Sequence, residues 1–366
     1  MRTFATIEEA AGDWVSLDRR HSNVFSTYEW ASAWWRHFGA GRSLRLMAAR
    51  DQTGRVVAIL PMYSERRYGV PLVRFIGTGA ADQLGAVCEP GHPRELSALW
   101  AASRSNALCF AERLPANLDA ADAIGGSRIH AEPSPMISLS RFGSWEEYLA
   151  AHSANFRQQV RRRARRLAQG HEVRFRLTAG HRELASDFDS LLALHRARWK
   201  GTTDAFSGRQ AAFHREFAAR ALERGWLRLW LAEVGGAAVA AWYGFRFAQV
   251  EYFYQSGRDP AWERLAVGAG LLEHTIRAAF EDGMTEYRLL RGGERYKFRY
   301  ATSHGGVETV VAAPDGLRAT SLKLVRLLST TAAGRRVLSK MLRVLLYPPE
   351  QQATDRHRKL RDARAR

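Results

Sequence analysis

A glycine pair near the end of the sequence is followed at once by three side chains capable of acid–base and anion chemistry. The stretch LLRGGERYKFRYA, residues 289–301, presents Glu294, Tyr296 and Lys297 directly after two glycines. A carboxylate accepts protons, a phenol can donate one, and an ammonium group binds anions. The two leucines ahead of the glycines are typical of the end of a buried strand. The segment is therefore either a surface turn or the rim of an active site.

A second glycine-bearing segment, residues 258–283, leads into an amphipathic helix. Gly268 and Gly270 stand at the start of this helix. The first N–H groups of a helix lack partners within it and lie at the positive end of its dipole, so such a loop can bind phosphate. Simple entry into the helix is the plainer reading of two glycines. The aromatic strand before the loop and the polar segment after the helix favour a binding site.

The totals of the sequence describe a folded protein of more than one domain. The chain has 366 residues, of which 46% are hydrophobic and 11% aromatic, and its two cysteines are Cys88 and Cys109. This length suggests two domains. Two distant cysteines argue against a disulfide framework or a zinc cluster and favour a reducing cytoplasm. Neither a signal-peptide core nor a membrane-spanning run is recognisable, so a soluble, cytoplasmic protein is expected.

Positive charge is concentrated in two segments of the chain. Against 37 Asp and Glu stand 55 Lys and Arg, a formal net charge of +18. Residues 317–366 hold 13 basic and 3 acidic residues, with helical, amphipathic spacing around 336–346 and an end that should be disordered. Residues 155–170 form a predicted basic helix. Such patches favour nucleic acid, anionic lipid or phosphorylated cofactors, and solvated surfaces are the alternative. The helix arginines are Arg157, Arg161, Arg162, Arg163, Arg165 and Arg166.

The order of predicted elements is repeated along the chain. Residues 44–63 and 227–245 each indicate a hairpin, the second with a tight turn at Gly235-Gly236. In each half a further strand, a helix (92–104 or 268–283) and another strand follow. Chance similarity of short hairpins is the alternative to a duplicated α/β fold. The predicted domains are 1–135, 136–316 and a helical basic tail, 317–366.

These segments together resemble the GNAT acyltransferase superfamily, and within it the branch associated with cellulose biosynthesis (CelD/BcsL type). The resemblance spans roughly residues 20–312. It implies tandem GNAT-like mixed-sheet domains, similar to those of the Fem-type aminoacyltransferases, with acetyl-CoA or another acyl-CoA as donor and no metal. In the second half it is carried by residues 194–199, 213–245, 252–260, 267–272 and 289–297, and in the first half by residues 25–39, 60–63 and 75–85.

Three positions depart from the pattern of this family. The loop pattern (Q/R)-x-x-G-x-(G/A) places Arg or Gln three residues before the first glycine, where this chain has Leu265, with Arg264 one place away. The branch usually shows Ser-Pro where Ala266 and Val267 stand. An acidic residue in the strand before the glycine pair is replaced by Arg288.

The resemblance implies a role for each candidate residue in acyl transfer. The chemistry needs a bound pyrophosphate, a base, an oxyanion site and a proton for the leaving thiolate. Glu294, past the end of its strand, is the expected base, because Glu251 should point away from the tyrosine face of the preceding strand. Tyr296 is the expected acid. The backbone of Tyr254–Gly257 would hold the oxyanion, Lys297 would meet a phosphate or acidic group, and the pyrophosphate would lie on the amides of Ala266, Val267, Gly268, Ala269 and Gly270.

The acceptor site is expected on two neighbouring surfaces. Alternation along the strand places Tyr252, Tyr254 and Ser256 on one face. Helical spacing places His195, Arg198 and Trp199 on another face, where a core histidine beside a packing tryptophan is the alternative. Asp82 of the first half is a further candidate from across the domain interface.

Three functions follow from this sequence. The first is an acyl-CoA-dependent transferase acting on an amine or hydroxyl of a small or sugar-related acceptor, in exopolysaccharide or envelope synthesis. The second is a Fem-like transferase that uses aminoacyl-tRNA, which suits the basic helix. The third is a non-catalytic adaptor whose tail, residues 317–366, binds an anionic membrane surface.

Overall fold

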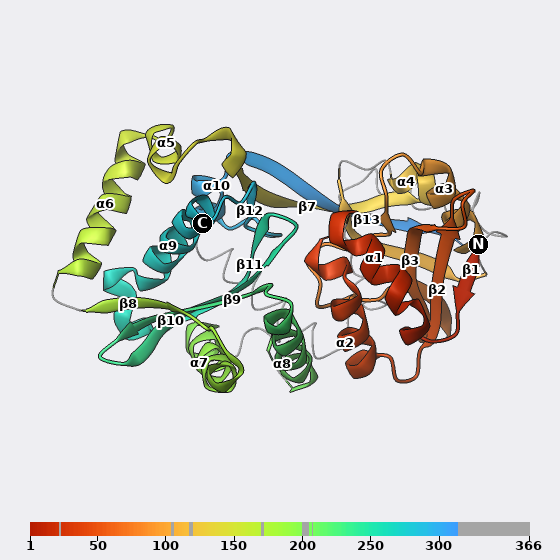
Figure 1. Ribbon diagram of the computed structural model, residues 1–366, viewed down its shortest axis with the longest axis horizontal. Helices are drawn as coiled ribbons and strands as arrows, with labels where there is room; N and C mark the ends of the chain where they lie inside the picture. Colours follow the sequence, from red (N-terminus) through yellow and green to blue (C-terminus); the bar gives the residue numbers. More distant parts are fainter. Residues whose placement is uncertain are drawn as a thin grey trace. The chain divides into compact units, whose positions relative to one another are not determined.

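The computed structural model divides the protein into two compact units. It describes residues 1–21, 23–103, 106–116, 120–169, 172–199, 205–206 and 208–313. Of the described residues, unit 1 comprises 1–132 and 306–313, and unit 2 comprises 133–305. In the described residues the strands form one sheet of 13 strands, and each unit holds a part of it with helices on its faces (Figure 1).

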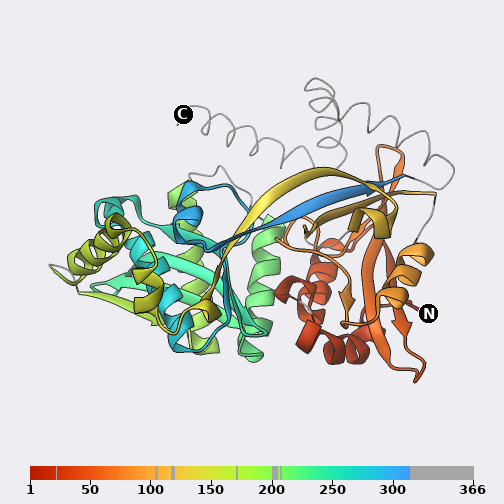
Figure 2. The same ribbon diagram turned by 90° about the horizontal axis from the view of Figure 1, so that it is seen from above.

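The part of the sheet in unit 1 has the strand order β1-β2-β3-β4-β6-β13, with β5 paired to β3. Side chains alternate across it: Tyr63 of β3 packs on Trp34 of α2, whereas Phe75 of β4 packs on Trp100 of α3. Helices α1 and α2 and helix α3 therefore lie on opposite faces, as Figure 2 shows. The elements are β1 (Arg2–Phe4), α1 (Ala11–His21), α2 (Tyr28–Phe38), β2 (Ser43–Arg50), β3 (Val56–Arg67), β4 (Val70–Phe75), β5 (Val87–Cys88), α3 (Pro93–Ser103), β6 (Leu108–Pro115), α4 (Ala120–Ile124), the start of β7 (Ser127–Ser138) and most of β13 (Ser303–Ala312).

The part of the sheet in unit 2 has the strand order β7-β12-β11-β10-β9-β8. Helices α7 and α8 cover one face, and α5, α6 and α9 cover the other (Figure 1). The elements are α5 (Trp145–Ala150), α6 (Ala154–Ala168), β8 (Val173–Leu177), α7 (His181–Trp199), α8 (Gly208–Glu223), β9 (Leu227–Val234), β10 (Ala237–Phe247), β11 (Val250–Arg258), the 3-10 turn η4 (Pro260–Leu265), α9 (Val267–Glu281), β12 (Glu286–Arg288) and α10 (Arg295–Tyr300).

The predicted repeat is present in both units. In unit 1 the antiparallel strands β2, β3 and β4 are followed by α3 and by β6, which pairs parallel to β4. In unit 2 the strands β9, β10 and β11 are followed by α9 and by β12, which pairs parallel to β11. The turn at Gly235 (φ 56°) and Gly236 (φ 81°) joins β9 to β10 as predicted, because two residues with positive φ form a tight hairpin turn.

The boundaries between the units differ from the predicted ones at 135 and 316. The chain enters unit 2 within β7 and returns to unit 1 at residue 306, within β13. The reason is strand pairing, because β13 forms an antiparallel ladder with β6, from Val307 opposite Pro115 to Ala312 opposite Cys109. The predicted tail, 317–366, lies outside the described residues. No helix in the described ranges has both the length and the apolar sequence that crossing a membrane requires.

Candidate functional site

Strands β11 and β12 of unit 2 separate after a short parallel ladder. The ladder joins Val250–Tyr252 to Glu286–Arg288, and β12 ends there. β11 continues to Arg258, paired with β10 on its other side. The sheet therefore opens along residues 253–258, the segment whose backbone was expected to face an oxyanion.

A β-bulge at Tyr254 changes which face the end of β11 presents. Tyr243 of β10 lies opposite Gln255, and the next pair is Gly244 with Phe253, so Tyr254 is the extra residue. A bulge inserts one residue and resets the alternation of side chains. Ser256 pairs with Trp242, a residue of the core that also contains α9. The prediction that Ser256 shares the face of Tyr252 and Tyr254 was wrong for this reason.

Helix α9 begins beside this opening, with Ala266 as its N-terminal cap. Ala266 has φ 53° and ψ 37° and offers no side-chain cap, and the first turn of the helix contains no acidic residue. Gly268 is half-buried, and a Cβ added there would lie 3.5 Å from Cδ of Arg258. Sequence analysis missed Arg258, whose only signal was a basic residue at the end of β11. The amides of Ala266, Ala269 and Gly270 donate to backbone carbonyls, so in the described chain the N–H groups of Val267 and Gly268 are the ones without a partner inside the helix. The nearby Arg258 guanidinium is ion-paired with Glu263 at 2.6 Å.

Gly270 has a packing role. A Cβ at this position would overlap Cδ1 of Leu167 on helix α6. The glycine therefore allows α6 and α9 to approach closely, and it is buried. Of the two glycines at the start of α9, Gly268 is the partly exposed one, so it is the one that a ligand could approach.

Arg198 lies at the C-terminal end of α7 and hydrogen-bonds Oγ of Ser256. Its guanidinium also stands 4.8 Å from the centre of the Trp199 ring. Burial lowers the pKa of Arg198, and Tyr296 and Glu294 are close enough to oppose that shift electrostatically. Within the described ranges no carboxylate forms an ion pair with Arg198. Arg198 is half-buried, and a partly desolvated cation without a paired anion favours binding of an anion beside it.

The side chain of Glu294 lies over Gly292, where a Cβ would overlap its carboxylate. Gly292 has φ 131°, a conformation that strains other residues. The Glu294 side chain is 43% exposed, so it is open to a substrate. Gly292 therefore allows the sharp turn after β12 that places the Glu294 carboxylate at the rim of the opening.

Lys297 makes contacts inside the protein, and its contact with a phosphate or acidic group stays a prediction. It is buried, and its Nζ donates to the carbonyl of Arg291 at 2.6 Å and lies 3.2 Å from Oε2 of Glu294. A third contact, to the carbonyl of Leu290, is 3.4 Å long. Leu290 has φ 58°, so the ammonium group stabilises a strained backbone after β12. Lys297 is a positioning residue for the loop that carries Glu294.

Tyr296 is half-buried and packs against the core of unit 2. Burial raises the pKa of its phenol, and the charge of Glu294 adds to this effect, while Arg198 opposes it. The phenol therefore keeps its proton at neutral pH. A protonated phenol beside a carboxylate is able to act as a general acid.

Two histidines lie under the opening. His195 is 4% exposed, hydrogen-bonds Gln255, and has a buried Nε2 without a hydrogen-bond partner among the described residues. Burial lowers its pKa to about 4, and Arg198 acts in the same direction. His214 accepts or donates a hydrogen bond with the Tyr254 hydroxyl at 3.2 Å, and burial lowers its pKa to about 3. Both rings are neutral at pH 7.

We expect His195 to make folding stability depend on pH. Its folded-state pKa lies below the unfolded value of 6.5, so the unfolded chain binds the proton first as pH falls. The stability that the neutral His195 contributes is fully present above pH 6.5 and is lost as pH falls from about 6.5 to 4, about 3 kcal/mol in all. The free energy of unfolding, measured in urea, should fall between pH 7 and pH 4.5 in the wild type. In His195→Gln this fall should be smaller by about the same amount. Equal losses in both proteins would exclude this role.

Other predicted residues are placed as follows. Trp199 contacts His195 and Arg198 at the end of α7. Tyr252 is buried, with Arg288 5.5 Å from its ring centre, and Arg288 donates to Glu286 at 2.9 Å. Arg288, which stands where the family pattern has an acidic residue, is thus ion-paired with Glu286 of the same strand.

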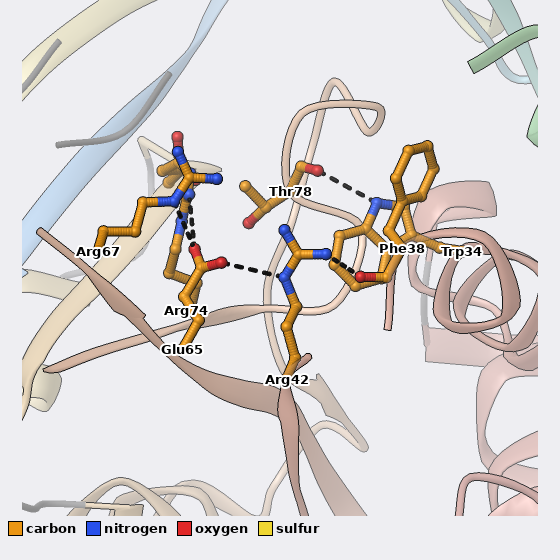
Figure 3. Close-up of polar contacts among 8 residues, drawn as sticks. Trp34, Phe38, Arg42, Glu65, Arg67, Arg74 and Thr78 are labelled. Carbon is orange, nitrogen blue, oxygen red and sulfur yellow. Dashed lines mark hydrogen bonds and ion pairs between the residues drawn. The ribbon is translucent and has the colours of Figure 1, made fainter. Parts of the chain in front are cut away.

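Asp82 belongs to unit 1, so its role at this site stays a prediction. The corresponding region of unit 1 is filled by its own charged side chains. Arg74, the last ladder residue of β4, donates to Glu112 at 2.7 Å and to Glu65 at 3.3 Å. Glu65 also accepts from Arg42 and Arg67, as Figure 3 shows.

The helix that follows this region in unit 1 also differs from α9. The first turn of α3 contains Glu95, which lies 3.5 Å from Nδ1 of His92. A carboxylate at a helix N-terminus disfavours phosphate at the same place. Of the two repeated units, unit 2 has the open strand end and the uncharged helix start.

Comparison with known proteins also points to unit 2 as the unit that contains the candidate site. Residues 154–298 match the family model of the acetyltransferase (GNAT) domain. The matched residues lie within the second unit. The match includes α6, the opening between β11 and β12, the N-terminal turn of α9 and Glu294. No curated protein sequence matches the chain.

Solved structures share the fold of the whole chain at low sequence identity. FemX is 12% identical with a TM-score of 0.60, and the match covers 85% of this chain and 97% of FemX. The C-terminal domain of a putative lysylphosphatidylglycerol synthetase from Agrobacterium fabrum is 10% identical with a TM-score of 0.53, over 84% and 92% of the two chains. L-PGS from Bacillus licheniformis is 12% identical with a TM-score of 0.51, over 82% and 96%. These matches, with the repeat of elements in the two units, show a tandem GNAT-like fold.

Proposed function

We propose that the protein transfers an acyl group, in the first instance acetyl, from acyl-CoA to an amine or hydroxyl at the opening between β11 and β12. The observation that carries this proposal is the end of the β11–β12 ladder at Tyr252, which leaves β11 open as far as Arg258, next to Gly268 in the N-terminal turn of α9. A thioester carbonyl in the opening and a pyrophosphate on the helix turn suit these two features.

The side chains at the rim supply the proton transfers. The acceptor nitrogen or oxygen attacks the thioester carbonyl, and Glu294 takes the proton released from the nucleophile, directly or through water. Backbone N–H groups of residues 253–258 hold the oxyanion. The C–S bond then breaks, and Tyr296 donates its proton to the departing thiolate. Arg198 binds an anionic group of the acceptor or donor next to this centre, since its charge has no carboxylate partner in the described ranges.

Acetyl-CoA should stabilise the protein against heat. Ligand at 100 times its Kd raises the free energy of unfolding by about 2.7 kcal/mol. Gly268→Asp should abolish this shift, because a carboxylate would occupy the phosphate position, and the site tolerates a Cβ.

Gly268→Asn is the matched neutral control and should retain most of the thermal shift. If Gly268→Asp and Gly268→Asn respond to acetyl-CoA alike, the pyrophosphate does not lie on this turn.

The acceptor class rests on resemblance to the cellulose-biosynthesis-associated branch. We propose a small or sugar-related acceptor in exopolysaccharide or envelope synthesis. A panel of amino sugars and polysaccharide fragments, assayed by thiol release from acetyl-CoA, tests this part separately from donor binding.

A second candidate donor is aminoacyl-tRNA. It is favoured by the folds of FemX and of L-PGS from Bacillus licheniformis and by the exposed arginines of α6. Salt-sensitive retention of tRNA, without any thermal shift by CoA, would support it over the first candidate. A third candidate, an adaptor that binds anionic membranes through residues 317–366, predicts liposome binding that is lost on deleting this tail.

A further inference from the structure

Helices α6 and α9 pack side by side in opposite directions. Nε of Arg163 donates to Oε1 of Glu273 at 3.0 Å, and one turn further along α6 the side chain of Leu167 fits against Gly270. Later residues of α6 therefore meet earlier residues of α9. The C-terminal turn of α6 consequently lies beside the N-terminal turn of α9, where the pyrophosphate is proposed to bind.

Two of the six arginines on α6 have internal roles. Arg163 is paired with the buried Glu273, which also accepts from Tyr300 at 2.8 Å. Arg157 donates to the carbonyls of Ala150 and His152 near the end of α5.

The other four arginines of α6 are exposed, and none forms an ion pair within the described ranges. They are Arg161, Arg162, Arg165 and Arg166. An unpaired row of guanidinium groups on one short helix is a strongly attractive surface for phosphate.

These four arginines fall on different flanks of α6. Successive residues of a helix are about 100° apart around its axis. Measured from Leu167, Arg166 lies about 100° around the axis and Gln159 about 80° in the same direction. Gln159 hydrogen-bonds Arg299, so this flank faces α10. Arg161 stands about 120° away in the other direction, on the opposite flank. Of the four arginines, Arg166 is next to Leu167 in the sequence. It also lies on the flank of α6 that faces α10, the helix containing Tyr296.

We propose that Arg166, with Arg162 one turn behind it, forms a subsite for the ribose 3′-phosphate of coenzyme A. The proposal rests on the proposed use of acyl-CoA and adds a determinant of donor recognition. A guanidinium forms two parallel hydrogen bonds to a phosphate, and a doubly charged terminal phosphate is the most anionic group of the donor. The loop pattern of this chain lacks the usual basic residue at Leu265, and Arg166 supplies positive charge from another helix.

The experiment compares acetyl-CoA with 3′-dephospho-acetyl-CoA by isothermal titration calorimetry on the full chain. Wild type should bind acetyl-CoA about tenfold more tightly than the dephospho compound. Arg166→Glu should remove this preference by weakening acetyl-CoA alone. Arg161→Glu, with the same charge change on the opposite flank, should keep it. Melting temperatures of both variants show whether either change acts through stability, because an arginine in the last turn also compensates the helix dipole.

The outcomes separate this inference from the function on which it rests. If wild type binds both donors equally, or Arg166→Glu weakens both equally, the subsite is excluded while acyl-CoA use stands. If Arg161→Glu removes the preference as well as Arg166→Glu, the effect is one of net charge and the specific subsite is excluded. If neither donor binds and Arg166→Glu instead weakens salt-sensitive retention of tRNA, both the subsite and acyl-CoA use are overturned.

Discussion

Glu294→Gln should lower turnover at least tenfold and leave the Kd for acetyl-CoA unchanged. The amide has the shape of the carboxylate and keeps the contact distance to Lys297, but it cannot take a proton from the acceptor. Because Glu294 is ion-paired with the buried Lys297, the change should also lower the melting temperature, so turnover is compared under conditions where the variant is folded. Thiol release from acetyl-CoA in the presence of an accepted amine measures turnover.

A matched control for this change is Glu281→Gln, on the last turn of α9. The Glu281 side chain is 60% exposed and ion-paired with Arg277, remote from the opening of the sheet. Full activity in this control with reduced activity in Glu294→Gln supports a base at 294. Unchanged turnover in Glu294→Gln would remove Glu294 from the chemistry and leave the base unassigned.

Gly257→Ala should reduce both stability and activity. A Cβ at this position would overlap the backbone nitrogen of His195 and lie 2.5 Å from the carbonyl carbon of Leu194. Backbone atoms cannot rotate away as a flexible side chain does, so α7 must move relative to β11. Overpacking of this kind costs about 1–3 kcal/mol. The same movement withdraws Arg198 from Ser256, and turnover should fall with it.

Gly180→Ala is the control for the Gly257 prediction. Gly180 immediately precedes α7, has no heavy atom within 4 Å of an added Cβ, and does not need a positive φ. Its unfolding free energy, measured in urea, should stay within about 0.5 kcal/mol of wild type. A Gly257→Ala protein as stable and active as wild type would show that α7 and β11 are not held in close contact.

The repeated fold could be predicted because it depends on local patterns. A continuous run of apolar residues marks β10, the glycine pair at 235–236 fixes its hairpin, and Gly268 marks the entry to α9. The order of these elements in both halves indicated a duplication, and the structure and its neighbours bear out a tandem GNAT-like fold.

The features that could not be predicted depend on contacts between different segments of the chain. The bulge at Tyr254 depends on the pairing of β11 with β10, and it reversed the predicted face of Ser256. The contacts of Lys297 with the carbonyls of Leu290 and Arg291 could not be predicted, because they depend on the backbone conformation at Leu290. The return of β13 to unit 1 depends on β6, nearly 200 residues earlier by sequence numbering.

The central claim is that acyl-CoA binds in unit 2, at the opening of β11 and the first turn of α9. Amide hydrogen exchange with and without acetyl-CoA tests this location directly. Binding should slow exchange in residues 253–258 and 266–270, and residues 75–85 of unit 1 should exchange as before. Protection confined to unit 1, or no protection under conditions where acetyl-CoA is bound, would contradict the account.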